Sequence, residues 1–131
     1  MANDLDDIAL DRNSFAFNDI RGQDGWQAFT PVFGSLTVVG ATSYSGRLRF
    51  VGKKLEGQVQ FSAATSIASA TSDYLNLPVP AKGLSGSGQM NNITANTSVG
   101  LCTLNVSQSR LYLPAQVASA NVFTLKFEYE V

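Results

Sequence analysis

Over the last ten residues of the chain, apolar and polar side chains alternate without a break from Phe123 onward. In a β-strand, successive side chains point to opposite faces of the sheet, so residues 122–131 would have one apolar and one polar face. The apolar face holds Phe123, Leu125, Phe127, Tyr129 and Val131. The face toward water holds Thr124, Lys126, Glu128 and Glu130. This pattern predicts a strand that is buried on one side, which is typical of antiparallel sheets.

The same period of two recurs in residues 55–61. After position 25, no stretch of comparable length shows the 3.6-residue period of an amphipathic helix. Other apolar runs of strand length are separated by turn signals, and we expect further strands at residues 26–33, 36–41, 44–51, 74–77, 89–95, 99–106 and 110–113. About eight or nine strands at this spacing predict an all-β chain, an antiparallel β-sandwich of the jelly-roll type.

The connections between these strands differ in their stiffness. The clearest hairpin joins residues 44–51 to residues 55–61 through the turn Gly52-Lys53-Lys54, and its apolar positions should meet the aromatic face of the last strand. Pro31 restricts the first strand to an edge or a bend. Residues 77–80 (LPVP) predict a rigid extended exit that cannot donate to a sheet ladder. We interpret residues 83–88 (GLSGSG) as a flexible connection.

The distribution of charge divides the chain near residue 24. Residues 1–24 carry six aspartates against two arginines, a net charge of −4, whereas residues 25–131 have a net charge of +3. A frayed acidic terminus is one interpretation of the first segment. Because a disordered tail would carry fewer large apolar residues, we favour an attachment arm that docks on another protein. This arm is expected to be irregular or to contain a short helical turn that begins at Asp4. Its apolar residues are Leu5, Ile8, Leu10, Phe15, Phe17 and Ile20.

The composition excludes several kinds of chemistry. The chain has 131 residues, which suits a single β-sandwich domain at residues 25–131 after the arm, and it contains no histidine, so a His-dependent triad or a His-ligated zinc site is excluded. Its charged fraction of 15% is low, and Ser, Thr, Asn and Gln supply the polar surface, as suits an extracellular or particle-bound protein. The single cysteine, Cys102, is expected to be an inert core thiol.

The sequence contains no clear sign of a cofactor, metal, nucleic-acid or membrane partner. The net charge is −1 and Lys53-Lys54 is the only basic pair, so we expect no nucleic-acid binding. No apolar run is long enough for a membrane span and the N-terminus does not resemble a signal peptide, which predicts a soluble protein made in the cytoplasm. The tight group Asp4, Asp6 and Asp7 lacks the glycine and glutamate of a calcium loop.

Carboxylates are the only candidates for acid–base catalysis. In the body, Glu56, Asp73, Glu128 and Glu130 are far apart in the sequence, and we interpret Glu128 and Glu130 as two solvated charges on a polar strand face rather than as a glycosidase pair. We therefore expect no catalytic residues. A hydrolase that uses Glu56 or Asp73 is the more distant alternative.

Four aromatic residues lie near strand ends or near Pro and Gly turns, where a flat amphipathic ring could stack on a sugar or enter a partner's pocket. They are Trp26, Tyr44, Tyr74 and Tyr112. Each could equally be an ordinary core residue, and the sequence does not distinguish them.

Several motifs, in this order and spacing, resemble the short β-rich domains of tailed-bacteriophage fibre and appendage proteins. They are residues 26–31 (WQAFTP), residues 45–47 (SGR) with residues 51–53 (VGK), residues 77–80 (LPVP), and the aromatic-rich last strand. The resemblance covers residues 26–131. It departs at Leu48, where many members of that family carry an aromatic residue, and in the acidic arm, which has no matching segment.

The resemblance implies a jelly-roll-like sandwich that assembles as a homotrimer on a phage particle. We expect a non-enzymatic structural protein of the virion, of the head-fibre or decoration type, with residues 1–24 bound to another virion protein. The start at a methionine and the short length favour such a subunit over a fragment of a long tail fibre. The alternative is a tail-fibre tip that recognises a host cell-surface glycan through one of the four aromatic residues.

Overall fold

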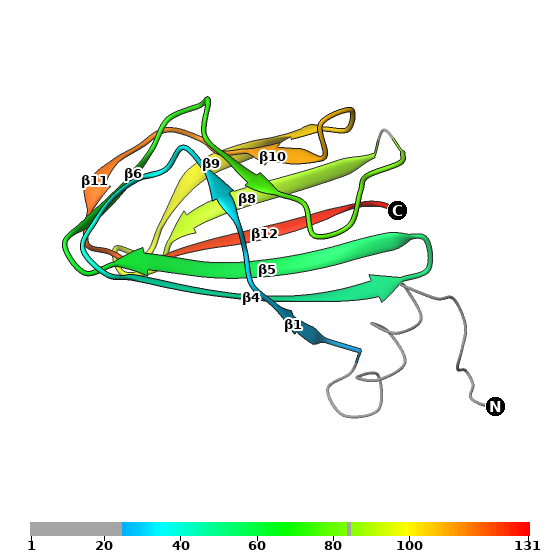
Figure 1. Ribbon diagram of the computed structural model, residues 1–131, viewed down its shortest axis with the longest axis horizontal. Coiled ribbons are helices and arrows are strands. Elements are labelled where there is room, and N and C mark those ends of the chain that lie inside the picture. The colour runs from blue at the N-terminus through cyan, green and yellow to red at the C-terminus, as the bar shows by residue number, and fades with distance from the viewer. Residues whose placement is uncertain (1–24, 84) are drawn as a thin grey trace.

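The computed structural model describes residues 25–83 and 85–131, so the attachment arm and its apolar residues lie outside the described part (Figure 1). The described residues form strands and no helix. In chain order the strands are β1 (Gln27–Phe29), β2 (Phe33–Gly34), β3 (Thr37–Val39), β4 (Thr42–Val51), β5 (Lys54–Ala63), β6 (Ser66–Ser69), β7 (Tyr74–Asn76), β8 (Gly86–Asn92), β9 (Thr97–Asn105), β10 (Arg110–Tyr112), β11 (Gln116–Ser119) and β12 (Phe123–Glu130).

The prediction of an all-β antiparallel sandwich is confirmed. Nine strands form one large sheet in the order β1-β4-β5-β12-β8-β9-β10-β7-β2, and three form a small sheet in the order β11-β6-β3. Every pairing between neighbouring strands is antiparallel. In Figure 1 the long strands β4, β5 and β12 run side by side, and β10 lies across from them.

The large sheet curls so that its two ends come together. Its end strands, β1 and β2, are separated in sequence by only residues 30–32. This link can span at most about 14 Å. In a flat nine-stranded sheet the two edges would lie about 38 Å apart. The sheet therefore folds back on itself, and its two halves form the two layers around the core.

Strand β9 carries the chain from one layer to the other. Its first part pairs with β8 and its last part, Thr103 to Asn105, pairs with β10. The register against β8 shifts between Met90, which faces Gly100, and Asn91, which faces Ser98. Val99 is thus an extra residue, a β-bulge, and bulges bend a strand and increase its twist.

The aromatic face of the last strand is the centre of the core, as predicted. Phe123 and Leu125 are fully buried, and Tyr129 and Phe127 are 1% and 5% exposed. The hairpin is also confirmed: β4 and β5 pair over ten residues each, and β5 is the direct neighbour of β12. The turn is shorter than expected, because Lys54 belongs to β5 and Gly52 takes a φ of +63°, which glycine adopts without strain.

The structure differs from the sequence-based expectations in three respects. The strand expected at residues 26–33 is split into β1 and β2 around Pro31, which cannot donate to a ladder, and both pieces are edge strands. Residues 86–88, expected to be a flexible connection, are the first residues of β8. Strands β6 and β11 were not expected, because each has a single large apolar residue, Ile67 or Val117, among small or polar residues.

Glycines lie beside the large rings of β12. Phe127 faces Gly57 on one side and Gly88 on the other, and Tyr129 faces Gly86. A Cβ atom on Gly57 would lie 2.2 Å from Cζ of Phe127. Gly57 therefore makes room for the Phe127 ring, and a Cβ atom on Gly86 would lie 2.4 Å from Cδ2 of Leu104, so these glycines allow close packing rather than flexibility.

The Leu-Pro-Val-Pro segment is held by Tyr129. The Tyr129 hydroxyl donates a hydrogen bond to the carbonyl oxygen of Val79 at 2.7 Å and accepts one from its N–H at 3.2 Å. Burial raises the pKa of Tyr129, and the hydrogen bond with Val79 opposes that effect. The N–H and the carbonyl of Val79 therefore have hydrogen-bond partners, although this segment does not belong to a sheet.

Replacing Tyr129 by Phe should lower the free energy of unfolding by about 1–2 kcal/mol at pH 7, because both Val79 groups lose their partner. The pH dependence should change as well. Below pH 10.0 the hydroxyl is protonated in both states; above it the unfolded state loses the proton first, so the stabilisation by Tyr129 falls as the pH rises. Denaturant titrations between pH 7 and 11 should show a flatter alkaline decline for Tyr129→Phe than for the wild type.

The matched control is Tyr112→Phe, which removes a hydroxyl from the outside of the molecule and keeps both bonds to Val79. Cys102, whose pKa is also raised by burial, is present in all three proteins, so its contribution cancels. Equal alkaline slopes for the wild type and Tyr129→Phe would contradict the proposed role of the Tyr129 hydroxyl.

Candidate functional site

The outer side of strands β4, β5, β12 and β8 forms one continuous polar surface, here called the polar face. Along each strand the apolar side chains point inward, so the alternate positions point outward. The register aligns these outward positions into rows that cross the strands. The central row contains Arg47, Gln58, Lys126, Gln89 and Leu101. The row beside it contains Arg49, Glu56, Glu128 and Ser87.

An open groove crosses this face. It consists of two adjoining cavities of ≈ 360 and ≈ 320 Å³, which share Gln58 and Lys126. The first cavity reaches from Trp26 to Leu101 and includes Glu56 and Glu128. The second lies over β4, β5 and β12 and includes Arg47, Gln60 and Thr124. We call the two together the polar groove.

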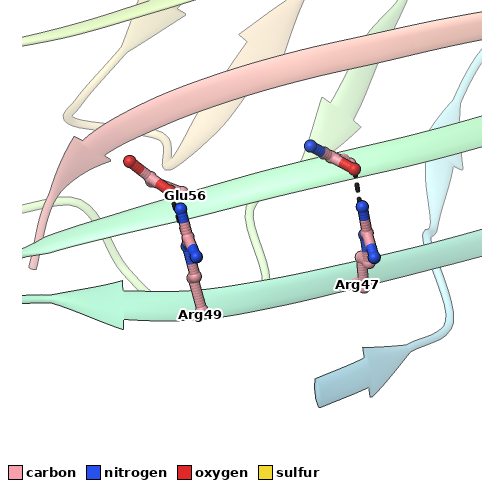
Figure 2. Close-up of polar contacts among 4 residues, drawn as sticks. Arg47, Arg49 and Glu56 are labelled. Carbon is pink, nitrogen blue, oxygen red and sulfur yellow. Dashed lines mark hydrogen bonds and ion pairs between the residues drawn. The ribbon is translucent and has the colours of Figure 1, made fainter. Parts of the chain in front are cut away.

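Two arginines of β4 lie beside Trp26 on the polar face, and Arg47 also lines the second cavity. Arg47 and Arg49 lie opposite Gln58 and Glu56 in the β4–β5 register, which lets each guanidinium reach across the strands. Arg47 Nε donates to Gln58 Oε1 at 2.9 Å, and Arg49 Nε donates to Glu56 Oε1 at 2.8 Å, as Figure 2 shows.

Trp26 lies against both of these guanidinium groups. The Cζ atoms of Arg47 and Arg49 are 4.4 and 4.6 Å from the centre of the indole ring. Such contacts attract a cation to the π-face of the ring and hold the ring in a defined orientation. The half-buried Trp26 is therefore fixed at one end of the polar groove.

The carboxylates of the polar face are closer together than their sequence positions suggest. Glu56 and Glu128 lie directly opposite each other on β5 and β12, although they are far apart in the sequence. Each has a cationic partner: Arg49 Nε is 2.8 Å from Glu56, and Lys54 Nζ is 4.0 Å from Glu128. Both pairs are substantially exposed to solvent, and exposed pairs of this kind contribute little to stability.

Asp73 is the one buried carboxylate of the described residues, at 5% exposure. Its Oδ2 accepts a hydrogen bond from the N–H of Ala70 at 2.8 Å, and its own N–H donates to the carbonyl of Ala70. These two bonds close a turn before β7. Asp73 thus shapes a connection and does not lie with Glu56 and Glu128.

The four aromatic candidates fall into three separate places. Trp26 lies at the polar groove. Tyr44 is half-buried and packs edge-on against Phe33, with ring centroids 5.3 Å apart. Burial raises the pKa of Tyr44, and its hydrogen bond with Thr42 acts in the opposite direction. Tyr74 and Tyr112 meet each other, with centroids 5.5 Å apart, on the outer side of β7 and β10 in the other layer.

Arg110 completes that second cluster. Its guanidinium carbon is 4.0 Å from the centre of the Tyr74 ring, and its Nη1 donates to the Tyr112 hydroxyl at 3.3 Å. The hydrogen bond with Tyr112 is the largest cause that raises the pKa of Arg110. The sequence did not indicate that Arg110, Tyr74 and Tyr112 would meet. Their contact depends on the pairing of β7 with β10, which is decided by the tertiary structure and not by a local sequence pattern.

Cys102 lies on β9 opposite Gly88 and is half-buried. Burial raises the pKa of its thiol to about 12, so the thiolate is scarce at neutral pH and the thiol is a poor nucleophile. Within residues 25–83 and 85–131, no group of three or more acidic or Cys side chains is placed to hold a metal ion. The same residues contain no helix that could cross a lipid bilayer.

The motifs that carry the resemblance to phage appendage domains contact one another in pairs. Trp26 lies against Arg47. Gly46 lies under Phe29, since a Cβ atom at this position would be 2.8 Å from the Phe29 ring. Tyr129 of the last strand holds Val79 of the Leu-Pro-Val-Pro segment. A scan against protein-family models and searches of curated proteins and solved structures found no match for this chain.

Proposed function

We propose that this protein is a structural subunit of a tailed-phage virion, of the head-fibre or decoration type, which assembles as a homotrimer and attaches to another virion protein through residues 1–24. The main support is the pairing of the motifs: residues spread from position 26 to position 129 make the three contacts described above. The motifs therefore belong to one folded unit, which is compatible with a single domain of the phage-appendage kind. The charge difference between residues 1–24 and the body supports separate roles for the two parts.

The small sheet supports self-assembly. Its two edge strands, β3 and β11, carry the exposed apolar residues Val38, Val39 and Val117, which are 36%, 50% and 79% exposed. Open edges with apolar side chains are prone to uncontrolled pairing, and closed symmetric packing of identical subunits covers them. Threefold packing through this sheet would bury edges and apolar surface together.

The full chain is expected to give the mass of a trimer in light scattering, and residues 25–131 alone should remain folded and trimeric. The shortened protein should no longer attach to phage particles, because the proposed arm is missing. The full chain is the control in both measurements. A monomeric full chain would contradict the assembly, unfolding of the shortened protein would place the arm in the core, and particle attachment without residues 1–24 would remove the arm's role.

A second candidate is the tip of a tail fibre that binds a host cell-surface glycan. The observation that favours it is Trp26, which two arginines hold against one end of an open polar groove. Aromatic rings at the ends of polar grooves provide a flat apolar surface with hydrogen-bonding groups beside it. Binding of a glycan and attachment to a particle are compatible in one appendage subunit.

A further inference from the structure

The polar groove has apolar side chains at its two ends and polar side chains between them. Trp26 lies at the β4 end and Leu101 at the β9 end. Leu101 is 78% exposed. It lies in the middle of β9, at a position where a polar side chain would be equally compatible with the strand. The row from Arg47 to Leu101 crosses five strands, a length of about 19 Å. The groove is therefore long enough for a chain of several rings and offers an apolar contact at each end.

Charge is unevenly distributed along the groove. In the central row, Arg47 and Lys126 lie on either side of Gln58. Among the described residues, neither cation has a carboxylate within ion-pair distance. The carboxylates of the neighbouring row, Glu56 and Glu128, are already paired with Arg49 and Lys54. Of the described residues that line the cavity shared by Arg47 and Lys126, none is acidic. An anionic group is therefore favoured at this position.

The remaining groups of the groove suit hydroxyl-rich ligands. Gln58 accepts from Arg47 through its Oε1 and keeps its amide NH2 as a donor, whereas Gln89 donates its Nε2 to Asn91 and Ser98 and keeps its Oε1 as an acceptor. Glu56 and Glu128 offer acceptor oxygens toward the first cavity. Sugar hydroxyl groups can donate to such carboxylates and accept from such amides. A sugar ring also has an apolar side that can lie against Trp26 or Leu101.

We propose that the polar groove binds an acidic saccharide of two or more rings, in which an uncharged ring lies against Trp26 and an anionic substituent lies between Arg47 and Lys126. The acidic ring is bound at the centre of the groove, and the next ring extends toward Leu101. This inference rests on the glycan-binding candidate above and specifies the class of ligand and the residues that recognise it. It concerns the isolated protein and is independent of the trimer and of particle attachment.

The test uses the full chain and titration calorimetry with three tetrasaccharides: a hyaluronan oligomer, which alternates uronic acid with a neutral sugar, an oligogalacturonate, and a neutral N-acetylglucosamine oligomer. Binding to at least one acidic oligomer, at least tenfold tighter than to the neutral one, is expected. The affinity should fall as the salt concentration rises, because exposed charges are screened. Trp26→Ala and Lys126→Ala should each weaken binding about tenfold, the effect of losing one charge-assisted or aromatic contact.

Two control variants separate the groove from the rest of the surface. Lys53→Ala removes the same charge as Lys126→Ala from the exposed β4–β5 turn outside the groove, and Tyr112→Ala removes an aromatic ring from the other layer. Both should bind like the wild type, and circular dichroism should show that all variants are folded.

Equal affinity for the neutral oligomer, or no binding to either acidic oligomer, would overturn the proposal. Loss of binding in Tyr112→Ala but not in Trp26→Ala would assign recognition to the other layer. Release of reducing ends that Glu56→Gln abolishes would indicate hydrolysis instead of binding. These measurements need no phage particle. A lack of saccharide binding would therefore not contradict the proposal of a trimeric subunit, and a lack of particle attachment would not contradict the proposal of saccharide binding in the polar groove.

Discussion

Phe127→Asp is expected to lower the free energy of unfolding by about 4 kcal/mol or more, which would leave little of the stability of a typical domain. Phe127 is 5% exposed, its ring lies against Gly57, and it stacks near Tyr129 at 6.1 Å between centroids. The substitution removes an aromatic ring from the core, which alone costs about 3–5 kcal/mol. It also places a carboxylate among the apolar side chains of the core, where the group is either buried as an unpaired charge or takes up a proton.

The neighbouring residue provides the control. Lys126→Asp introduces the same side chain one position earlier on β12, where the side chain is exposed, and should change stability by less than about 1 kcal/mol. Urea denaturation of both variants measures the difference directly. An unchanged melting temperature for Phe127→Asp, or a larger loss for Lys126→Asp, would mean that β12 presents the opposite face to the core.

Phe61→Ala is expected to destabilise the protein by about 3–5 kcal/mol, because it leaves a cavity between β5 and the edge strand β2. Phe61 is 1% exposed on β5. Its ring centroid is 4.9 Å from that of Phe33 on the edge strand β2 and 5.7 Å from that of Phe123 on β12. Phe61 thus joins strands that lie far apart in the order of the sheet.

Gln60→Ala changes the adjacent outward residue of β5 and should alter stability by no more than about 0.5 kcal/mol. Both variants can be compared by thermal and urea denaturation. A loss below 1 kcal/mol for Phe61→Ala would contradict the closure of the sheet around this ring. A loss of similar size in both variants would indicate that β5 as a whole, rather than the packing of Phe61, is sensitive to substitution.

The polar groove and the small sheet have different roles in these proposals. The valines of β3 and β11 are apolar and lie at strand edges, which suits contact between copies of the chain. The polar groove lies on the outside of the central strands and has hydrogen-bonding groups between Trp26 and Leu101. One subunit can therefore assemble through its edges and still present the groove to a ligand.

The sequence alone was sufficient for the elements whose information is local. The last strand and the β4–β5 hairpin were predicted with the correct faces, because an alternation over eight or ten residues determines which side chains are buried whatever the partner strand is. The effects of Pro31 and Gly52 are also local. Pro31 has no backbone N–H to donate to a neighbouring strand, and Gly52 adopts the positive φ of the turn. Trp26 was recognised as a candidate contact, although three other aromatic residues had an equal claim.

Only the tertiary structure decided which residues meet across strands. Strands β6 and β11 have too few apolar residues to be recognised alone, and they exist because each finds a partner in the small sheet. The same is true of Glu56 and Glu128, which are opposite each other because β5 and β12 pair, and of the row that places Arg47 beside Lys126. Alternation along a strand determines the face of a residue, but the neighbour across the sheet depends on strand order and register, which are decided by long-range packing of the core.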